Sequence, residues 1–368
     1  MNSSLRRWAS AACCTLMLLS CASAQASATF PALGQDALSV RYPERNVLQA
    51  AAMAGTRVVA AGEHGIVVLS DDGGRNWRQA ARVPVAVTLT ALQFVDARQG
   101  WAVGHGGVIL HTNDGGNTWQ RQTDGTQLGR IALDAATDRV RQFPADRETL
   151  AQLEIAKQVA ANSATAPLLD LWFVDASHGF VVGAYNQFFE TTDGGKTWTS
   201  AADRLVNPKG LHLYSIRARG DVVLISGEQG LLLRSRDGAR HFRPLSSPYE
   251  GSWFSSVFLS DREIVIAGLR GNAFYSSDAG ESWTRFAGAG QVSFSSAVAL
   301  ANGAVLLSNQ AGQCFVGFMG GRLTLLDVPP QPPLSAVLPL DAGDILALGA
   351  AGVLRLALPS PPSRSVAR

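Results

Sequence analysis

The sequence predicts an all-β fold, a seven-bladed β-propeller of four-stranded blades with a helical hairpin inserted between blades two and three. Three observations support this prediction. A glycine motif recurs about every 40 residues, an aromatic residue follows it at a constant offset, and turn signals divide each repeat into four short apolar segments. Four strands in a repeat of this length are typical of a propeller blade.

The composition agrees with a folded, turn-rich protein. Of the 368 residues, 46% are apolar, 16% are charged and 37 are glycine. So low a charged fraction disfavours coiled coils and long solvated helices. The formal net charge of +2 gives no overall attraction for nucleic acid or anionic lipid. We therefore expect no nucleic-acid partner, and we also expect no cofactor.

The first element is a predicted export signal at residues 1–24, with Arg6 and Arg7 ahead of an apolar stretch and small residues at its end. A second interpretation makes Cys21 the acylated cysteine of a lipobox. No later run is apolar for long enough to span a bilayer. The mature chain is therefore expected in the periplasm, soluble or lipid-anchored through Cys21, without inserting directly into the membrane. The remaining Cys314 is interpreted as a buried apolar residue.

The repeats that follow share two motifs. An apolar residue precedes Gly-x-x-Gly, or a close variant, seven times, with first positions Gly62, Gly104, Gly183, Gly227, Gly268, Asn309 and Gly349. The first five copies are followed by the pattern Ser/Thr-x-Asp-x-Gly-x-x-aromatic, which is weakened in the fourth copy. Its aspartates are Asp72, Asp114, Asp193, Asp237 and Asp278, and its aromatic residues are Trp77, Trp119, Trp198, Phe242 and Trp283. This pattern resembles the Asp-box, or bacterial neuraminidase repeat.

We assign the Asp-box residues a structural role. The carboxylate can accept N–H bonds inside its own turn, and the aromatic ring can wedge between neighbouring sheets. Five equivalent turns cannot each be an active site, so we expect no catalytic residues among them.

The strand pattern places the propeller at residues 37–359. The innermost strands are expected to begin near Val47, Thr88, Leu169, Leu213, Phe254, Val292 and Leu334. The last unit has sequence for only three strands, so residues 37–42 are predicted to supply its outer strand and close the ring. The tail at residues 360–368 is expected to be disordered.

The insertion at residues 124–167 changes to helical periodicity, with a break at Pro144 and a new start at Asp146. This helical hairpin should lie on the same face as the turns of the glycine motif. Side chains at those turns differ from blade to blade, which leaves them available for recognition. The candidate partner-binding residues are Glu63, His64, His105, Tyr185, Asn186, Glu228, Gln229, Arg270 and Gln310.

The segment Leu-Trp-Phe-Val-Asp at residues 171–175, continued by residues 178–183 and 191–198, recurs in similar form at residues 94–119. It resembles the photosystem II stability and assembly factor family, including exported relatives in non-photosynthetic bacteria. The resemblance implies a seven-bladed propeller that is a non-catalytic assembly factor and binds a membrane-protein client. The hairpin resembles a feature of the bacterial relatives, some of which resemble partners of large membrane transporters, so a transporter-associated role is a second option.

Two other functions stay open at this point. Asp-boxes also occur in sialidases, which need a tyrosine nucleophile and an arginine cluster, and the chain has 5 tyrosines. Alternatively, Glu63, His64 and His105 on neighbouring turns could hold a metal or ligand in a sensor propeller.

Overall fold

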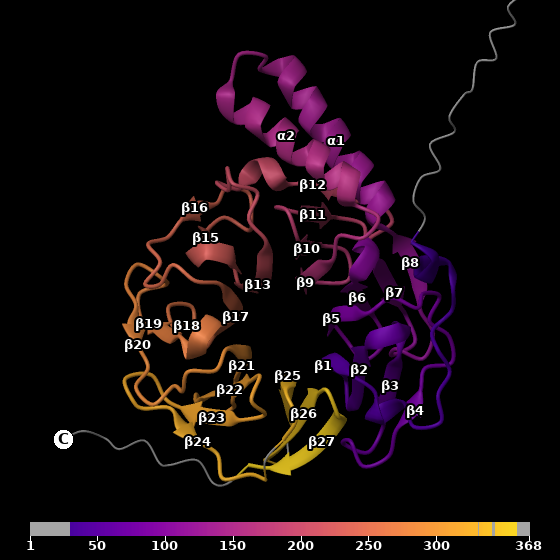
Figure 1. The fold of residues 1–368 in the computed structure, drawn as a ribbon, viewed down its shortest axis with the longest axis vertical. Helices are drawn as coiled ribbons and strands as arrows, with labels where there is room; N and C mark the ends of the chain where they lie inside the picture. The colour runs from indigo at the N-terminus through magenta and orange to yellow at the C-terminus, as the bar shows by residue number, and fades with distance from the viewer. Residues whose placement is uncertain (1–29, 330, 341–342, 359–368) are drawn as a thin grey trace, which may run out of the picture.

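Seven antiparallel sheets surround a central opening in the computed structural model (Figure 1). The structure describes residues 30–329, 331–340 and 343–358. Within these ranges six sheets have four strands and the seventh has three. The predicted signal at residues 1–24, with Cys21, and the tail at residues 360–368 lie outside the described residues.

The strands follow the chain from the centre of each sheet outward. Sheet one contains β1 (Leu48–Ala54), β2 (Arg57–Gly62), β3 (Val67–Ser70) and β4 (Arg78–Gln79). Sheet two contains β5 (Leu89–Phe94), β6 (Gly100–Gly104), β7 (Ile109–Thr112) and β8 (Gln120–Thr123). Sheet three contains β9 (Leu168–Phe173), β10 (Gly179–Gly183), β11 (Phe188–Thr191) and β12 (Thr199–Ser200).

The remaining sheets repeat this order. Sheet four contains β13 (Leu213–Arg219), β14 (Val222–Gly227), β15 (Leu232–Ser235) and β16 (Arg243–Pro244). Sheet five contains β17 (Trp253–Phe258), β18 (Ile264–Gly268), β19 (Ala273–Ser276) and β20 (Thr284–Arg285). Sheet six contains β21 (Phe294–Ala299), β22 (Val305–Asn309), β23 (Cys314–Gly317) and β24 (Thr324–Leu325). Sheet seven contains β25 (Leu334–Pro339), β26 (Asp344–Gly349) and β27 (Gly352–Ala357).

The first strands form the inner ring. Each one contacts the first strand of the next sheet, and β25 contacts β1, so the ring closes. The second strands are buried along almost their whole length, because each sheet packs between two neighbours. The prediction of a mostly-β propeller is confirmed, and the observed first strands begin within two residues of the expected positions.

The predicted closure by residues 37–42 is wrong in its detail, because this segment forms no strand. It lies beside sheet one, where the Ala37 N–H donates to Val83 O at 2.8 Å. The Gln79 side chain accepts from Val40 N and donates to Leu38 O. These backbone groups would otherwise pair with a neighbouring β-strand. Pro43 then begins the short 3-10 helix η2 (Pro43–Arg45), which contacts β27, β3 and β4.

Two antiparallel helices separate β8 from β9 in the chain: α1 (Gly125–Gln142) and α2 (Arg147–Asn162). Asp124 caps α1 by accepting N–H bonds from Thr126 and Gln127, and Asp146 caps α2 by accepting one from Thr149. The hairpin projects outward from the ring beside sheets two and three (Figure 1). Gly125 permits a close approach, since a Cβ there would lie 1.8 Å from Ser163 O.

Among the described residues, no helix is long and apolar enough to cross a bilayer. Cys314 is buried, and burial raises the pKa of its thiol to about 11. A thiol with so high a pKa is unreactive at neutral pH, in agreement with the apolar role expected for Cys314.

Candidate functional site

The Asp-boxes form compact hydrogen-bonded turns between the third and fourth strands. In sheet three, Thr191 Oγ1 donates to Asp193 Oδ1 at 2.9 Å, while the Thr197 N–H and hydroxyl donate to its two carboxylate oxygens at 2.9 and 2.6 Å. These bonds stabilise the charged form, so the hydroxyl and N–H of Thr197 lower the pKa of Asp193 to about 2. The carboxylate is thus occupied within its own turn.

The other boxes repeat these contacts. Asp72, Asp114, Asp237 and Asp278 each accept a hydroxyl bond from the Ser or Thr two residues earlier and an N–H bond from the residue four positions later. Trp119, Trp198 and Phe242 are buried, whereas Trp77 and Trp283 are half-buried. Connections alternate between the two ends of an antiparallel sheet, so the boxes lie on the face opposite the turns that join second to third strands.

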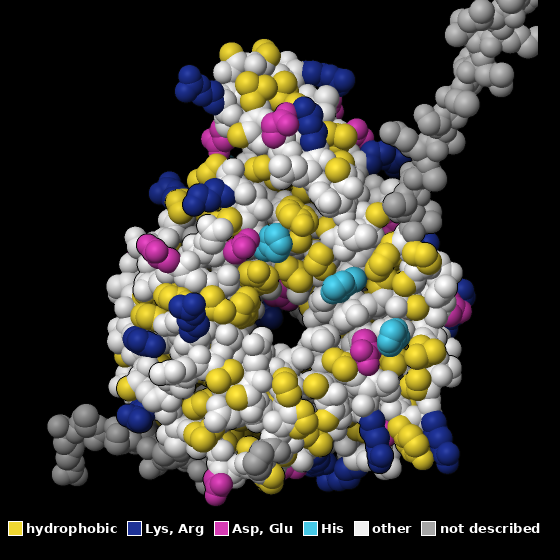
Figure 2. Space-filling model, viewed as in Figure 1, with side chains coloured by type: hydrophobic (Ala, Val, Ile, Leu, Met, Phe, Trp, Pro, Cys, Tyr) yellow, Lys and Arg dark blue, Asp and Glu magenta, His cyan; other side chains and the backbone are white. Residues whose placement is uncertain are grey.

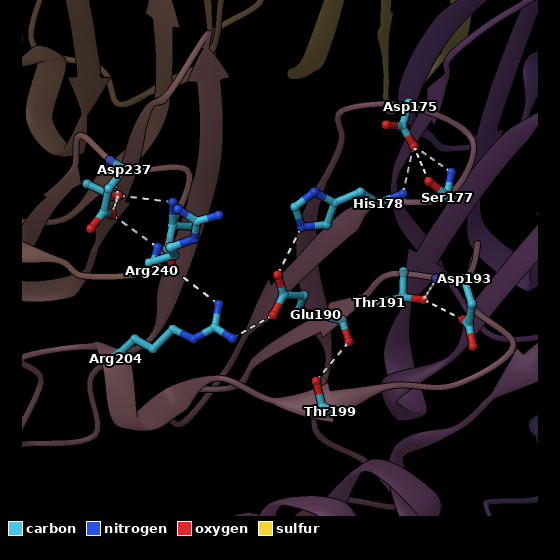
Figure 3. A network of polar contacts seen from close by, with 12 residues as sticks. Asp175, Ser177, His178, Glu190, Thr191, Asp193, Thr199, Arg204, Asp237 and Arg240 are labelled. Atoms are coloured by element: carbon cyan, nitrogen blue, oxygen red, sulfur yellow. Dashed lines mark hydrogen bonds and ion pairs between the residues drawn. The ribbon is translucent and has the colours of Figure 1, made fainter.

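A histidine, a glutamate and an arginine link sheets three and four on this Asp-box face (Figure 3). Glu190 contacts His178 Nε2 at 2.9 Å through one oxygen and accepts from Arg204 Nη2 at 2.6 Å through the other. Arg204 also donates to Ala239 O at 3.2 Å. Burial opposes ionisation of Glu190, but the bonds from Arg204 and His178 outweigh it and hold the pKa of this carboxyl below its usual value. Because both carboxylate oxygens are engaged, the cluster acts as a cross-link between sheets.

The opposite face, which we call the hairpin face, carries the turns between second and third strands together with α1 and α2. Helix α1 contacts the turn η4 (His105–Gly107) of sheet two. At the turns of the other sheets, left-handed φ angles between 52° and 62° occur at His64, Tyr185, Asn186, Gln229 and Arg270. Their backbone is strained for residues with a Cβ.

The structure separates the nine candidate residues into two groups. Six have exposed side chains: His64, His105, Tyr185, Gln229, Arg270 and Gln310. The other three, Glu63, Asn186 and Glu228, make contacts within the scaffold. Among the described residues, no hydrogen bond or ion pair joins any two of the nine.

Glu63 and Glu228 have the same local role in sheets one and four. Glu63 Oε1 accepts from the Val47 N–H at 3.3 Å, and Glu228 Oε2 accepts from the His212 N–H at 3.2 Å. Both donors lie just before the first strand of their sheet. Asn186 is only 2% exposed, because its side chain accepts from Asn207 Nδ2 at 2.9 Å inside the fold. The expectation that Asn186 is an exposed turn tip is therefore wrong.

Rings that the sequence reasoning missed connect the turn of sheet three to the central opening. The ring centroids of Tyr185 and His212 are 4.9 Å apart, those of His212 and Tyr214 6.2 Å, and those of Tyr214 and Phe254 5.1 Å. The sequence signal for these rings is the aromatic residues at the start of the first strands. A strand prediction alone assigns such residues to the hydrophobic core.

The central opening is a channel of about 460 Å³ lined by the first strands. Asp170 lies there, only 6% exposed, and accepts from Arg217 Nη1 and from the Ile216 N–H. Burial, followed by the charge of Glu228, raises the pKa of Tyr214. A sialidase-type site also needs unpaired arginines for the substrate carboxylate. In the described channel lining, Arg217 pairs with Asp170 and Arg219 with Asp261, so these residues do not favour the hydrolase alternative.

The metal alternative also receives no geometric support. Over the described ranges, no three His, Cys, Asp or Glu side chains gather in a way that could hold a metal ion. Glu63, His64 and His105 thus do not form a joint set of ligands.

Three of the large apolar side chains that are exposed among the described residues lie on the hairpin or on the turn beside it. Phe143 is 51% exposed and Leu150 is 41% exposed, and both lie at the tip of the hairpin, where α1 ends and α2 begins. Tyr185 is 36% exposed on the neighbouring turn. Figure 2 shows hydrophobic surface on the hairpin and around the central opening. Apolar surface of this kind is typical of sites of protein interaction.

Comparison with known proteins agrees with this geometry. Residues 151–284 match the model of the family described as photosynthesis system II assembly factor YCF48. A photosystem II assembly lipoprotein Ycf48 of Synechococcus sp. (strain CC9902) is 33% identical over 117 residues, which cover 31% of this chain and 35% of the relative. The resemblance to the photosystem II assembly factors is confirmed. A second YCF48 relative, from Prochlorococcus marinus, is also 33% identical over 117 residues. The matched region spans about a third of the length of these two relatives.

Solved structures extend the YCF48 resemblance to the fold of most of the chain. A YCF48 bound to a D1 peptide superposes with a TM-score of 0.62 at 16% identity, covering 88% of this chain and 99% of that one. YCF48 from Cyanidioschyzon merolae gives 0.62 at 14% identity, covering 86% of this chain and 97% of that one. The WD40 propeller domain of Doa1 gives 0.60 at 10% identity, covering 88% and 95%. These similarities concern the propeller fold alone.

Proposed function

We propose that the protein is a non-catalytic, exported scaffold that binds a membrane-protein client on its hairpin face. In this proposal residues 37–359 form a seven-bladed propeller, and residues 124–167 are a helical insertion between its second and third blades. The exported chain is periplasmic, either soluble or anchored through Cys21.

The observation that carries the proposal is the placement of exposed apolar side chains. Phe143, Leu150 and Tyr185 lie on the hairpin and on the turn beside it. On the Asp-box face, Glu190 pairs with Arg204, and the Asp-box carboxylates are hydrogen-bonded within their own turns. An apolar centre that offers aromatic residues is characteristic of protein interfaces.

The YCF48 relatives support the type of partner. They are named as assembly lipoproteins of photosystem II, and one YCF48 has been solved with a D1 peptide bound. A propeller of this fold therefore takes up a peptide of another protein, and the lipoprotein names agree with acylation at Cys21. We expect the client to belong to a photosystem or to a membrane transporter.

Photo-crosslinking in the native cell tests the proposal. A photoreactive amino acid is placed at Tyr185 or at Phe143 on the hairpin face, and as a matched control at Val174, which is 59% exposed on the Asp-box face. We expect integral membrane proteins among the adducts of positions 185 and 143 and not of position 174. Identical adducts from all three positions, or soluble proteins alone, would refute the proposal.

A further inference from the structure

A cavity of about 230 Å³ lies between the hairpin and the third sheet. Ala132 from α1 and Ile155 and Ala156 from α2 line one side, and Phe189 of β11 lines the other. The cavity is somewhat smaller than the ~300–1,000 Å³ of pockets for drug-sized ligands. It therefore suits one side chain or one small molecule.

Two buried amide side chains line this cavity, whose lining is part apolar and part polar and also includes Gln142, Gln152 and Ser200. Gln187 and Asn186 are each 2% exposed. Among the residues that the structure describes, neither Oε1 nor Nε2 of Gln187 has a hydrogen-bond partner, and Asn186 Nδ2 has none either. Buried polar groups without partners destabilise a fold, and native proteins contain few of them. These three atoms therefore need an explanation that the fold itself does not supply.

Equivalent positions in the other sheets show that the fold does not require a polar residue here. The fourth residue after the first position of the glycine motif is apolar in sheets one, two, four and seven, as Ile66, Val108, Leu231 and Val353. In sheet five Asn272 donates to Leu269 O at 2.9 Å, and in sheet six Gln313 accepts from Asn309 Nδ2 at 2.9 Å. Of these seven positions, only the one beneath the hairpin carries an amide with no local partner.

We propose that this cavity binds a neutral carboxamide group. The Gln187 amide offers one donor and one acceptor side by side, which match the acceptor and donor of a second carboxamide, while Asn186 Nδ2 offers a further donor. The charged side chains that line the cavity are paired, Arg139 with Asp203 at 2.8 Å and Asp138 with Arg141 at 2.7 Å. An ion entering the cavity would lose its hydration without gaining a free counter-charge.

The carboxamide can come from two sources. One is a free small amide, and the other is an asparagine or glutamine side chain of a client. Only the second source rests on the proposed function above. Both sources share the same recognition by Gln187 and Asn186, so experiments with simple probes test the site without any client.

Butyramide is the test probe, and 2-pentanone and butyrate are its matched controls. The ketone replaces the NH₂ group by a methyl group, and the acid carries a charge. Protein-observed NMR titration of the full chain should show saturable shifts with butyramide and at least tenfold weaker binding of the other two. Absence of butyramide binding, or equal binding of 2-pentanone, would overturn the inference.

A substitution at Gln187 tests whether its amide serves ligand binding or folding. Gln187→Leu should abolish butyramide binding and leave the Tm unchanged or higher, because it removes an unpartnered buried amide. Asn272→Leu, at the equivalent position of sheet five, should bind butyramide like the wild type. A marked fall in the Tm of Gln187→Leu would show that the amide serves the fold, and retained binding in this variant would also contradict the proposal.

A peptide pair identifies the source. If Ala-Gln-Ala binds more tightly than butyramide and Ala-Leu-Ala does not bind, the natural occupant is a client side chain; if Ala-Gln-Ala is excluded while butyramide binds, it is a free amide. Either result supports the carboxamide site. Crosslinking at position 185 tests the client proposal, and the butyramide titration tests the carboxamide site. The two experiments are independent, so failure of one proposal can be told apart from failure of the other.

Discussion

Leu128 of helix α1 and Trp101 of strand β6 lie in the same buried apolar cluster, and neither side chain is exposed to solvent. Val159 of α2 belongs to this cluster too, together with Phe173 of β9. The inner side of the hairpin is therefore part of the core between sheets two and three. Its tip, its outer side and the cavity beside sheet three are left free for a partner.

This packing predicts that Leu128→Ala destabilises the whole protein. Truncating a fully buried leucine removes apolar contacts and leaves a cavity, which typically costs about 3 kcal/mol in the free energy of unfolding. Urea unfolding followed by tryptophan fluorescence measures the change. A loss below about 0.5 kcal/mol, the size typical of surface substitutions, would show that the hairpin is only loosely attached.

The Asp-box turns should act on stability alone. Asp193→Ala removes the bonds from Thr191 and Thr197, so it should lower the free energy of unfolding by about 1 kcal/mol. Trp198→Ala deletes a buried indole and should cost ~3–5 kcal/mol. Calorimetry combined with client binding checks both variants at a temperature where they remain folded. Loss of client binding by Asp193→Ala at unchanged stability would contradict the structural role.

The turn carboxylates also predict an acid-dependent loss of stability. Hydrogen bonds from Ser177, Thr197 and Ser282 lower the pKa of Asp175, Asp193 and Asp278 to about 2, against ~3.9 in an unfolded chain. The unfolded state thus takes up protons first as the pH falls. Stability from these groups is complete above about pH 4 and is lost progressively toward pH 2.

Urea unfolding at several pH values between 5 and 2.5 measures this dependence. The double variant Asp193→Asn and Asp278→Asn cannot titrate at these positions, so its free energy of unfolding should fall less steeply with acid than that of the wild type. Equal slopes for the two proteins would mean that these carboxylates do not couple folding to pH.

Features of the fold that repeat along the chain, or that depend on neighbouring residues, could be predicted from the sequence. The spacing of the glycine motif predicted the sheets, and Pro144 with Asp146 predicted where one helix ends and the next begins. Closure of the ring was mispredicted because Gln79 is distant in sequence from the backbone of Leu38 and Val40 with which it pairs. A contact between segments so far apart leaves no periodic signal.

The candidate site was predictable only in part. Its face follows from strand connectivity, and the exposed Tyr185 was identified from its turn position. The burial of Asn186 depends on Asn207, which lies on the segment between sheets three and four. Likewise, the rings of Tyr185, His212, Tyr214 and Phe254 form one row only once sheets three, four and five are placed side by side.

In the proposed function, the client binds the hairpin face through its apolar tip. The membrane protein identified by crosslinking is purified in detergent, and its Kd is measured for the double variant Phe143→Ser and Leu150→Ser. The control is the double variant Val174→Ser and Leu325→Ser, whose two side chains are 59% and 50% exposed elsewhere on the molecule. Burial of each large apolar side chain contributes ~1.5–3 kcal/mol, so the hairpin variant should bind at least tenfold more weakly. The control should bind like the wild type. Unchanged affinity of the hairpin variant, or an equal loss in the control, would contradict the account.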